Sequence, residues 1–411
     1  MREFAGKHIL ILVENLPSPF DHRVWLEACA LRDRGARVTI VCPKGPGYRM
    51  GHEKIDDIDI FRHPVIEARR AAGYLVEYSL ALLCEFLLCA FVFLRRRFHV
   101  MHICNPPDLL FLVAVPYKYL MGMKVVFDQH DINPELVLAK FGRRGPWYRL
   151  MLALERRTFR TADHCIATNE SYRRIALTRG GRKPDQVTVV RSGPSVERMK
   201  IMAPVPILKN GRRILVAYVG VIGRQEGLTY LVDSCAYLVE TLGRKDIQFI
   251  VVGSGPELPV VKGYMRRKGM EEYFTFPGRV PDRELLEALN TADICVNTDE
   301  YNEMNDKSTM NKIMEYMALK KPIVQFELTE GRVSAGEASL YARPNDAYDL
   351  AEKILELADD PEKRRRMGEI GYERIRTSLS WEYQKEHLYK VYRGIFSQGG
   401  RKIRRWEPSG R

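Results

Sequence analysis

Short runs of aliphatic and β-branched residues alternate with longer helical patterns along the chain. The first half contains six runs with the length of buried strands: HILILV, ARVTIVC, HVMHIC, MKVVFD, ADHCIAT and QVTVVRS. The second half repeats the scheme with RRILVAYVG, IQFIVVG, YFTFPG, DICVNT, KPIVQF and SLYA. Strands that are apolar throughout and alternate with helices form parallel sheets covered on both faces. The pattern therefore predicts an α/β fold with two doubly wound, Rossmann-like domains.

A break in this pattern separates the two halves. Residues 199–213 are rich in proline and polar residues and show no sustained period, as is typical of linkers. We therefore expect an amino-terminal domain over 1–205 and a second domain over 206–380, which face each other across a cleft. A helix at 381–396 is expected to cross back to the first domain. The basic tail at 397–411 is expected to be disordered.

One helical stretch is unusually apolar. Residues 74–94 read YLVEYSLALLCEFLLCAFVFL, about the length of a membrane-spanning helix, and arginines follow at 95–97. Glu77 and Glu85 interrupt the run, and a carboxylate at bilayer depth is costly. We expect a helix packed in the domain core, with a helix that also dips into the membrane surface as the first alternative and a true span as the second. Arginine-rich flanks suit the surface alternative.

Composition and charge narrow the class of protein. With 411 residues, of which 45% are hydrophobic and 28% charged, the chain is globular and too long for one core. The formal charge of +13 indicates a polyanionic partner. Nucleic acid is not expected, because the basic residues form no nucleic-acid-binding motif. The eight cysteines form no CxxC pair and most lie in apolar runs, which predicts buried thiols in a cytoplasmic protein.

Ligands of doubly wound sheets bind at the carboxyl ends of the strands, so candidate residues are sought there. In the second half, the turn VGSGPE contains Gly253, Gly255 and Pro256, whose backbone could approach a phosphate. The turn VGVIGRQEG adds the cation of Arg224. A tight strand-to-helix turn without a ligand and a solvated arginine are the open alternatives.

The segment NTDEYNEMNDKSTMNKIMEYMALKKP leads from a strand into a helix. Ser308 is the expected N-cap of that helix. A helix N-terminus with Lys307 beside it favours a diphosphate, and Glu315, two turns on, could accept two hydrogen bonds from a ribose diol. The alternative is a solvated helix face on which Glu315 pairs with Lys312, Asn311 or Lys320.

Three strand ends in the first half carry polar side chains. The segment MKVVFDQHDINPE places an imidazole and carboxylates at the cleft-facing edge of the predicted sheet. A histidine that is only a satisfied polar residue remains the alternative. The candidates in this half are Asp21, His22 and Arg23 in ENLPSPFDHRVW, Asn105 and Asp108 in HICNPPDLL, and Asp128, His130 and Asp131.

Other enzyme classes find little support. The nine histidines are scattered, and no HxH, HExxH or Cys/His cluster indicates a metal site. Neither GxSxG nor GxxxxGK[ST] occurs, so a serine hydrolase and a P-loop nucleotide hydrolase are disfavoured. We expect no metal and no cofactor.

Together these segments resemble the family 4 (group 1) glycosyltransferases, retaining nucleotide-sugar enzymes of the GT-B fold, up to about residue 390. PFDHRVWLEACAL resembles the family's first loop and helix, HICNPPDLL its acceptor-side turn and FDQHDINPE its active-site histidine turn. VVRSGP, VGSGPE, FPGRVP and STMNKIMEYMALKKPIV resemble the interdomain strand and the nucleotide-binding half.

The resemblance implies roles for particular residues. Glu315 would be the second glutamate of the E-x7-E motif and hold the donor ribose, and His130 would lie near the transferring sugar. The implied donor-binding set is Gly253, Gly255, Pro256, Ser308, Thr309, Asn311 and Glu315. The implied acceptor-side set is Asp21, His22, Arg23, Asn105, Asp108 and Asp131.

The chain also departs from the family pattern. The first glutamate of E-x7-E falls at Lys307, and the arginine and lysine that commonly neutralise the donor diphosphate fall near Val221 and Glu226. A departing diphosphate needs cations or donors where negative charge develops. We therefore expect Arg224 and Lys307 to act with His130 as the catalytic set.

The resulting expectation is a metal-independent transfer of a sugar from a nucleoside-diphosphate sugar to a hydroxyl of a saccharide or lipid-linked saccharide, in surface polysaccharide or glycoconjugate synthesis. The charge and the apolar helix suggest a peripheral location at the inner face of the cell membrane. A non-catalytic nucleotide-sugar-binding relative and a GT-B nucleotide-sugar epimerase are the alternatives. Retention of His130 with Glu315 argues against the first of these.

Overall fold

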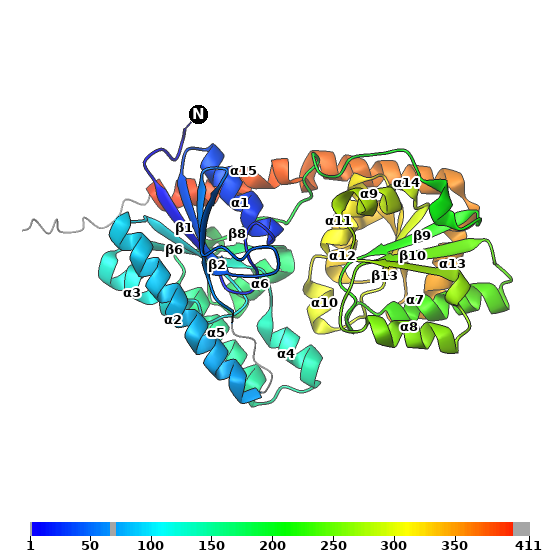
Figure 1. The fold of residues 1–411 in the computed structure, drawn as a ribbon, viewed down its shortest axis with the longest axis horizontal. Helices are drawn as coiled ribbons and strands as arrows, with labels where there is room; N and C mark the ends of the chain where they lie inside the picture. The colour runs from blue at the N-terminus through cyan, green and yellow to red at the C-terminus, as the bar shows by residue number, and fades with distance from the viewer. Residues whose placement is uncertain (1, 66–70, 398–411) are drawn as a thin grey trace, which may run out of the picture. The chain divides into compact units, whose positions relative to one another are not determined.

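The structure, a computed structural model, describes residues 2–65 and 71–397, with the side chains of 71–76 excepted. The chain divides into two compact units (Figure 1). Unit 1 comprises Met1–Arg191 and Lys385–Arg411, and unit 2 comprises Ser192–Gln384. The part of the predicted disordered tail beyond Ser397 lies outside the described residues.

Unit 1 is built on an eight-stranded sheet in the order β3-β4-β2-β1-β5-β6-β7-β8. All neighbouring strands are parallel except β3 and β4, which form an antiparallel pair at the edge. The strands are β1 His8–Val13, β2 Arg37–Pro43, β3 His52–Ile55, β4 Ile58–His63, β5 Val100–Cys104, β6 Lys124–Gln129, β7 His164–Ala167 and β8 Val187–Val189.

The helices of unit 1 cover both faces of this sheet. Right-handed crossovers place α2, α3, α5 and α6 on one face and α1 on the other. The helices are α1 His22–Asp33, α2 Ala71–Arg95, α3 Phe111–Met121, α4 Asn133–Phe141, α5 Pro146–Thr161 and α6 Glu170–Thr178. Helix α15, Trp381–Ser397, joins this unit from Lys385 onward, where the Tyr389 hydroxyl donates to the carbonyl of Ala30 at 3.2 Å.

Unit 2 has a six-stranded, fully parallel sheet in the order β11-β10-β9-β12-β13-β14. Its strands are β9 Ile214–Val219, β10 Ile247–Val252, β11 Phe274–Gly278, β12 Ile294–Asn297, β13 Ile323–Phe326 and β14 Ser339–Ala342. Its helices are α7 Leu228–Ala236, α8 Leu258–Arg267, α9 Asp282–Thr291, α10 Glu303–Lys307, α11 Asn311–Ala318, α12 Thr329–Ala335, α13 Ala347–Asp359 and α14 Pro361–Arg374.

The periodicity of the sequence located every strand of unit 2 and most of unit 1. The fully apolar strands are buried along their whole length, β1 and β10 among them. Two strands of unit 1 lie outside the six apolar runs. Strand β4, IDIFRH, mixes charged and apolar residues, and strand β3, HEKI, is polar with side chains that alternate between exposed and half-buried positions. The expectation of purely parallel sheets is therefore wrong for one edge of unit 1.

The boundary between the units lies at Arg191, before the predicted position near residue 205. Gly193 packs so closely on the chain that precedes α15 that a Cβ atom would lie 2.2 Å from the carbonyl oxygen of Leu379. Met199 is buried in the core of unit 2. The proline-rich segment that looked like a linker therefore belongs to unit 2.

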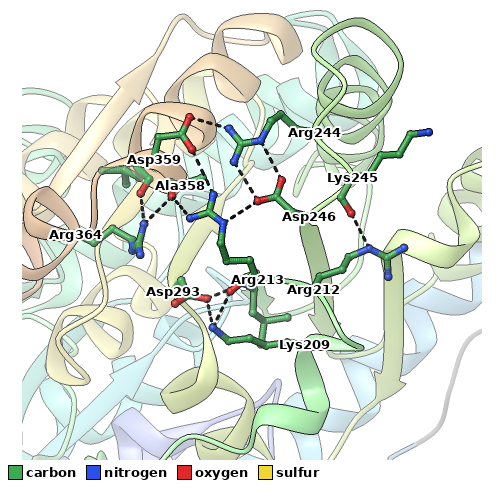
Figure 2. A network of polar contacts seen from close by, with 12 residues as sticks. Lys209, Arg212, Arg213, Arg244, Lys245, Asp246, Asp293, Ala358, Asp359 and Arg364 are labelled. Atoms are coloured by element: carbon green, nitrogen blue, oxygen red, sulfur yellow. Dashed lines mark hydrogen bonds and ion pairs between the residues drawn. The ribbon is translucent and has the colours of Figure 1, made fainter.

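Charged residues fasten the amino ends of the unit 2 strands, as Figure 2 shows. Arg213, just before β9, donates to Asp246, just before β10, at 2.9 Å. Arg244 donates to Asp359 at 2.7 Å, which ties this edge to the end of α13. These side chains lie at the edge opposite to the one at which doubly wound sheets bind ligands.

Candidate active site

Two turns at the carboxyl ends of β9 and β10 pack directly on each other. The N–H of Ile222 donates to the carbonyl of Ser254 at 3.1 Å. A Cβ atom at Gly253, where φ is 143°, would lie 1.8 Å from the carbonyl oxygen of Gly220, and one at Gly255 would lie 2.3 Å from that of Ile222. These glycines are therefore required by the contact between the turns, whether or not a phosphate binds there.

A largely buried lysine, 11% exposed, lies beneath these turns. The Nζ atom of Lys312, on α11, lies 3.1 Å from Asp299 Oδ1 and 3.3 Å from the Tyr218 hydroxyl. Its Cε atom would be 3.5 Å from a Cβ atom at Gly220. Burial opposes the charge of Lys312, but Asp299 outweighs burial and raises the pKa of the ammonium group. A permanent positive charge thus lies next to the first turn.

Glu315 lies on the same helix, one turn beyond Lys312. Its Oε1 atom accepts a hydrogen bond from Arg198 Nη1 at 3.1 Å. Arg198 also donates hydrogen bonds to Asp282 from Nε at 2.8 Å and from Nη2 at 3.0 Å. Burial raises the pKa of Glu315, and Arg198 works against that rise. The side chain is 22% exposed, so the carboxylate remains accessible to a ligand. The pairing with Lys312, Asn311 or Lys320 weighed from the sequence is replaced by the pairing with Arg198.

The segment before α11 differs from the prediction. Ser308 is the C-cap of the short helix α10, and its hydroxyl donates to the carbonyl of Met304 at 2.7 Å. The residue that caps the start of α11 is Met310, which offers no side-chain acceptor. Ser308 is therefore not the N-cap of the helix that carries Glu315, because the chain forms a separate turn of helix first.

Lys307 stands at the end of α10 and its Nζ atom lies 3.4 Å from Glu303. It is not at the start of α11 as expected, and Thr309 lies between the two helices. Asn311 is the exposed first residue of α11.

Arg224 is exposed on the turn after β9, together with Val221, and Pro256 is exposed on the turn after β10. The carbonyl of Gln225 accepts hydrogen bonds from the Glu300 N–H at 2.9 Å and from Asn305 Nδ2 at 3.0 Å. The turn that carries Arg224 is thus fastened to the segment that leads to Lys307.

Glu226, at the position where the family commonly has a cation, folds back on its own turn. Its Oε2 atom accepts from the N–H of Gly223 at 3.1 Å. Burial raises the pKa of its carboxyl group, and the charge of Asp299 adds to this effect. A more neutral Glu226 would repel an anionic ligand less than a surface glutamate does.

Five helices of unit 2 begin at this edge of the sheet without a side-chain cap. The residues at their N-cap positions are Gly227 for α7, Glu257 for α8, Pro281 for α9, Met310 for α11 and Leu328 for α12. By contrast, Asp346 caps α13 with hydrogen bonds to the N–H groups of Tyr348 and Asp349. Uncapped N-termini present backbone N–H groups and a partial positive charge, which suit an anion.

In unit 1, His130 follows β6 and is held by a buried ion pair. Its Nε2 atom lies 2.5 Å from Asp128 Oδ2. Arg23 of α1 binds the same carboxylate through Nε at 2.9 Å and Nη2 at 2.8 Å, and its Nη1 donates to the carbonyl of Val190. Both Arg23 and Asp128 are buried.

These charges set the protonation of the histidine. Burial opposes ionisation of Asp128, but Arg23 holds the pKa of that carboxyl well below its usual range. Burial likewise disfavours the imidazolium of His130, yet Asp128 outweighs it and raises the pKa of the ring. His130 is therefore biased toward its protonated, hydrogen-bond-donating form.

The loop that carries His130 is fixed by the turn after β5. Asn105 Oδ1 accepts from the N–H of His130 at 2.8 Å, and Asn105 Nδ2 donates to Asp108 at 3.1 Å. Asp108 accepts from Asn133 at 2.6 Å, and burial raises the pKa of its carboxyl to about 6. Asn105 and Asp108 are almost fully buried. The prediction that they touch an acceptor therefore needs correction, because they position the histidine loop.

The remaining acceptor-side candidates lie in different environments. Asp21 is the N-cap of α1 and accepts from the N–H of Val24 at 3.1 Å. Arg23 is enclosed and cannot contact an acceptor directly, whereas His22 is exposed at the first position of α1. Asp131 is half-buried, and burial raises the pKa of its carboxyl group.

A second group of buried polar residues lies behind Asp128, and the sequence did not indicate it. His102 lies 3.4 Å from Glu27 and its Nδ1 atom lies 2.7 Å from the hydroxyl of Tyr392, which comes from α15. Burial, with the charge of Asp128, raises the pKa of Glu27 to about 7. No local pattern marks these residues, because tertiary packing alone brings them together.

One trio of described residues has the side-chain chemistry and the proximity of a metal site. His102, Cys104 and Asp128 offer ligand atoms within 4.8 Å of one another, all buried. Asp128 is already bound by Arg23, whose positive charge opposes a cation there. The eight cysteines are all unbridged, and burial raises the pKa of the Cys104 thiol. This donor set therefore gives little support for a metal.

Unit 1 also contains a cavity of about 420 Å³ that the sequence did not reveal. It lies where β1, β2 and β4 end and α2 passes over them. Burial, with the charge of Glu77, raises the pKa of Glu14 in its wall to about 7. The lining residues are Glu14, Asn15, Leu16, Pro17, Pro43, Lys44, Gly45, Pro46, His63, Pro64, Val65, Glu77, Tyr78, Leu80, Ala81 and Cys84.

Two curated relatives show partial similarity to the chain. An α-D-kanosaminyltransferase from Streptomyces kanamyceticus is 25% identical over 44% of this chain and 46% of its own length, less than half of that protein. An α-maltose-1-phosphate synthase from Mycolicibacterium smegmatis is 26% identical over 67% of this chain and 74% of its own length.

Solved structures share the fold over nearly the whole chain. A sucrose-phosphate synthase from Thermosynechococcus elongatus has a TM-score of 0.74 and 17% identity, covering 96% of this chain and 100% of that one. The Anabaena protein HepE, in complex with UDP-glucose, has a TM-score of 0.72 and 15% identity, covering 94% of this chain and 99% of that one. The architecture of the two units is that of the GT-B fold.

Two family models match the chain in consecutive halves. The glycosyl transferase 4-like domain matches residues 22–193, and the model for glycosyl transferases group 1 matches residues 213–360. Both ranges contain the candidate residues described above. His130 lies in the first range and Glu315 in the second. The chain belongs to the group 1 glycosyltransferases and is a glycosyltransferase of the GT-B fold.

Proposed function

We propose that this enzyme transfers a sugar, with retention of anomeric configuration, from a nucleoside-diphosphate sugar to a hydroxyl of a saccharide or lipid-linked saccharide. The observation that carries the proposal is the carboxyl edge of the unit 2 sheet. There the accessible carboxylate of Glu315 and the buried cation of Lys312 lie on one helix, next to helix N-termini without side-chain caps. A ribose diol and a diphosphate need these two kinds of group.

In this proposal, unit 2 holds the donor. Glu315 accepts hydrogen bonds from the ribose, and the N-termini of α7, α8 and α11 bind the diphosphate. Lys312 adds positive charge from beneath the Gly220 turn, a role that the sequence assigned to Arg224 and Lys307. The last two remain exposed or half-exposed cations on the joined loops and can approach the phosphates from the solvent side.

Unit 1 is proposed to supply His130 and to bind the acceptor. The imidazolium of His130, fixed by Asp128 and Asn105, offers a hydrogen bond to a hydroxyl of the transferring sugar. The cavity bounded by Glu14 and Tyr78 has the mixed polar and apolar walls that suit a saccharide acceptor.

The proposed chemistry balances without a metal ion. The bond between the anomeric carbon and the phosphate oxygen breaks, and its electron pair leaves with the nucleoside diphosphate. The acceptor oxygen bonds to the same face of an oxocarbenium-like centre, and its proton passes to the departing phosphate oxygen. Fixed N–H groups and the charge of Lys312 stabilise the negative charge that develops. Retention is what the resemblance to the family implies.

Transfer is tested by incubating the enzyme with UDP-, GDP- and ADP-sugars and a panel of saccharide acceptors. We expect acceptor-dependent release of one nucleoside diphosphate that survives removal of divalent metal by a chelator. The anomeric configuration of the product, read by NMR, is expected to equal that of the donor. Inversion would contradict the proposed mechanism, and conversion of the donor sugar without an acceptor would favour an epimerase.

A further inference from the structure

We propose that the face of unit 1 formed by α2, α3 and α5 docks on the surface of an anionic lipid bilayer. The inference concerns a surface rather than the chemistry, so it does not depend on the proposed transfer. An anionic lipid surface is the partner that matches both the positive charge and the apolar character of this face.

Helix α2 presents an unbroken apolar stripe to solvent. Its exposed large residues recur at intervals of three and four, which places them on one side of a helix. The α2 stripe consists of Leu80, Leu83, Leu87, Phe91 and Leu94, with Phe86 beside it. Leu87 is 57% exposed and Leu94 is 85% exposed. A soluble protein rarely leaves such a row of large side chains in water without a partner.

The opposite side of α2 packs on its own unit. Ala81, Glu85, Cys89 and Val92 are buried, and Glu85 lies 3.8 Å from His63 at the end of β4. The stretch Glu77–Arg95 is long and apolar enough to cross a membrane by length and composition alone, but part of it, 28%, is buried inside the protein. The expectation of a core helix therefore holds for one side of α2 and not for the other. A helix with one packed side suits the membrane surface rather than a span.

Neighbouring helices extend the apolar face. Tyr117 of α3 packs against Phe86 and Phe93 of α2, with ring centroids 6.0 and 5.7 Å apart. Figure 1 shows α2, α3 and α5 gathered on the same side of unit 1. Further exposed residues on α3 and α5 are Leu112, Tyr119, Leu120, Met121, Trp147 and Leu150. Tryptophan and tyrosine are enriched where a protein meets lipid head groups.

The charge of this region is one-sided. Between residues 77 and 162 the acidic side chains are buried, except for Glu77 on α2 and Asp131 at the histidine site, which are half-buried. The same range exposes ten basic side chains: Arg95, Arg96, Arg97, Lys140, Arg143, Arg144, Arg149, Arg156, Arg157 and Arg160. Arg95 to Arg97 directly follow the α2 stripe. Anionic head groups attract such residues by about 1 kcal/mol each.

Vesicle flotation of the full chain tests the inference. We expect the protein to float with phosphatidylcholine vesicles that contain about 30% phosphatidylglycerol and to float far less with phosphatidylcholine alone. About 0.5 M salt should weaken the binding, because it screens the arginines. Failure to float with the anionic vesicles would overturn the proposal.

Two variants separate the apolar and the charged contributions. Leu87→Gln with Leu94→Gln, and the triple change of Arg95, Arg96 and Arg97 to Gln, should each lower the partition coefficient about tenfold or more. The matched controls change exposed residues of unit 2: Ile207→Gln with Val260→Gln, and Arg266, Arg267 and Arg376 to Gln. The two arginine triples remove the same charge. Equal loss in the variants and the controls would refute the assignment to this face.

A second copy of the chain is the other possible occupant of the stripe. Sedimentation without lipid decides this, since a dimer that Leu87→Gln with Leu94→Gln dissociates would replace the bilayer proposal. Thermal stabilisation by nucleotide, which reports on unit 2, is expected to be unchanged in these variants and shows that they are folded. Loss of flotation with intact nucleotide binding thus separates this inference from the proposed function.

Discussion

The two ends of the unit 2 sheet hold their cations in contrasting ways. At the amino ends, the exposed Arg213 and the half-buried Arg244 pair with Asp246 and Asp359 in a network open to solvent on the Arg213 side (Figure 2). At the carboxyl ends, Lys312 is buried against Asp299 beside turns and helix starts whose N–H groups have no side-chain cap. At the amino ends each cation is already paired with a carboxylate of the protein, so the network stabilises the fold and needs no ligand. A buried charge beside uncapped helix starts is an arrangement that a ligand can complete.

The largest expected effect is that of Lys312→Met on stability. The substitution leaves the carboxylate of Asp299, which is 2% exposed, buried without its main partner. Removing one member of a buried ion pair costs about 3–5 kcal/mol. Urea unfolding should show this loss in the free energy of unfolding. A loss below about 1 kcal/mol would mean that Lys312 is no more embedded than the surface arginines.

Glu315→Ala should affect ligand binding more than stability. Each hydrogen bond from the ribose to this carboxylate is worth about 1.5–3 kcal/mol, so the donor dissociation constant should rise at least about tenfold. Isothermal titration with the donor nucleotide measures the change. Glu369→Ala, on the exposed pair with Lys320, is the control and should bind as the wild type does.

His130 should make stability depend on pH in a defined direction. Because its pKa is raised in the folded protein, the His130–Asp128 pair contributes its full stability below the unfolded value near 6.5. This contribution is lost as pH rises through the folded pKa. Unfolding experiments from pH 6 upward should show a smaller decline in His130→Asn than in the wild type. An unchanged decline would show that His130 is not held as an imidazolium.

The smallest effect is expected at the amino ends. Arg213→Gln with Arg244→Gln removes ion pairs that are exposed at Arg213 and half-buried at Arg244, and ion pairs near the surface contribute about 0–1 kcal/mol each. The melting temperature should fall slightly and nucleotide binding should not change. A large loss of nucleotide binding would contradict the division of roles between the two ends of the sheet.

The sequence predicted the fold well because buried parallel strands appear in it as short runs of apolar residues. Runs such as HILILV and IQFIVV are apolar at every position, so the two sheets could be recognised. Strand β3 left no such record, since it is a polar edge strand. The apolar run of α2 predicted a helix, but composition alone did not show that only one side of it is buried.

The candidate site was predicted only in part. Glu315 lies on a helix and His130 directly follows a strand, as the sequence pattern indicated, but their partners are distant in the chain. Arg198 is 117 residues from Glu315, and Arg23 is 105 residues from Asp128. Ser308 was misread because a serine before a helical pattern is a typical N-cap, whereas the chain first forms α10 under the cap of Asn302.

The donor site at the carboxyl edge of unit 2 is tested most directly by thermal denaturation of the wild type, Glu315→Ala and Glu369→Ala with UDP, GDP and ADP, each with and without Mg²⁺. A ligand that binds only the folded state raises the melting temperature by mass action. We expect one nucleotide to stabilise the wild type and Glu369→Ala, irrespective of metal, and Glu315→Ala to lose most of the shift. Equal shifts in all three proteins would contradict the assignment of the donor site to the carboxyl edge of unit 2.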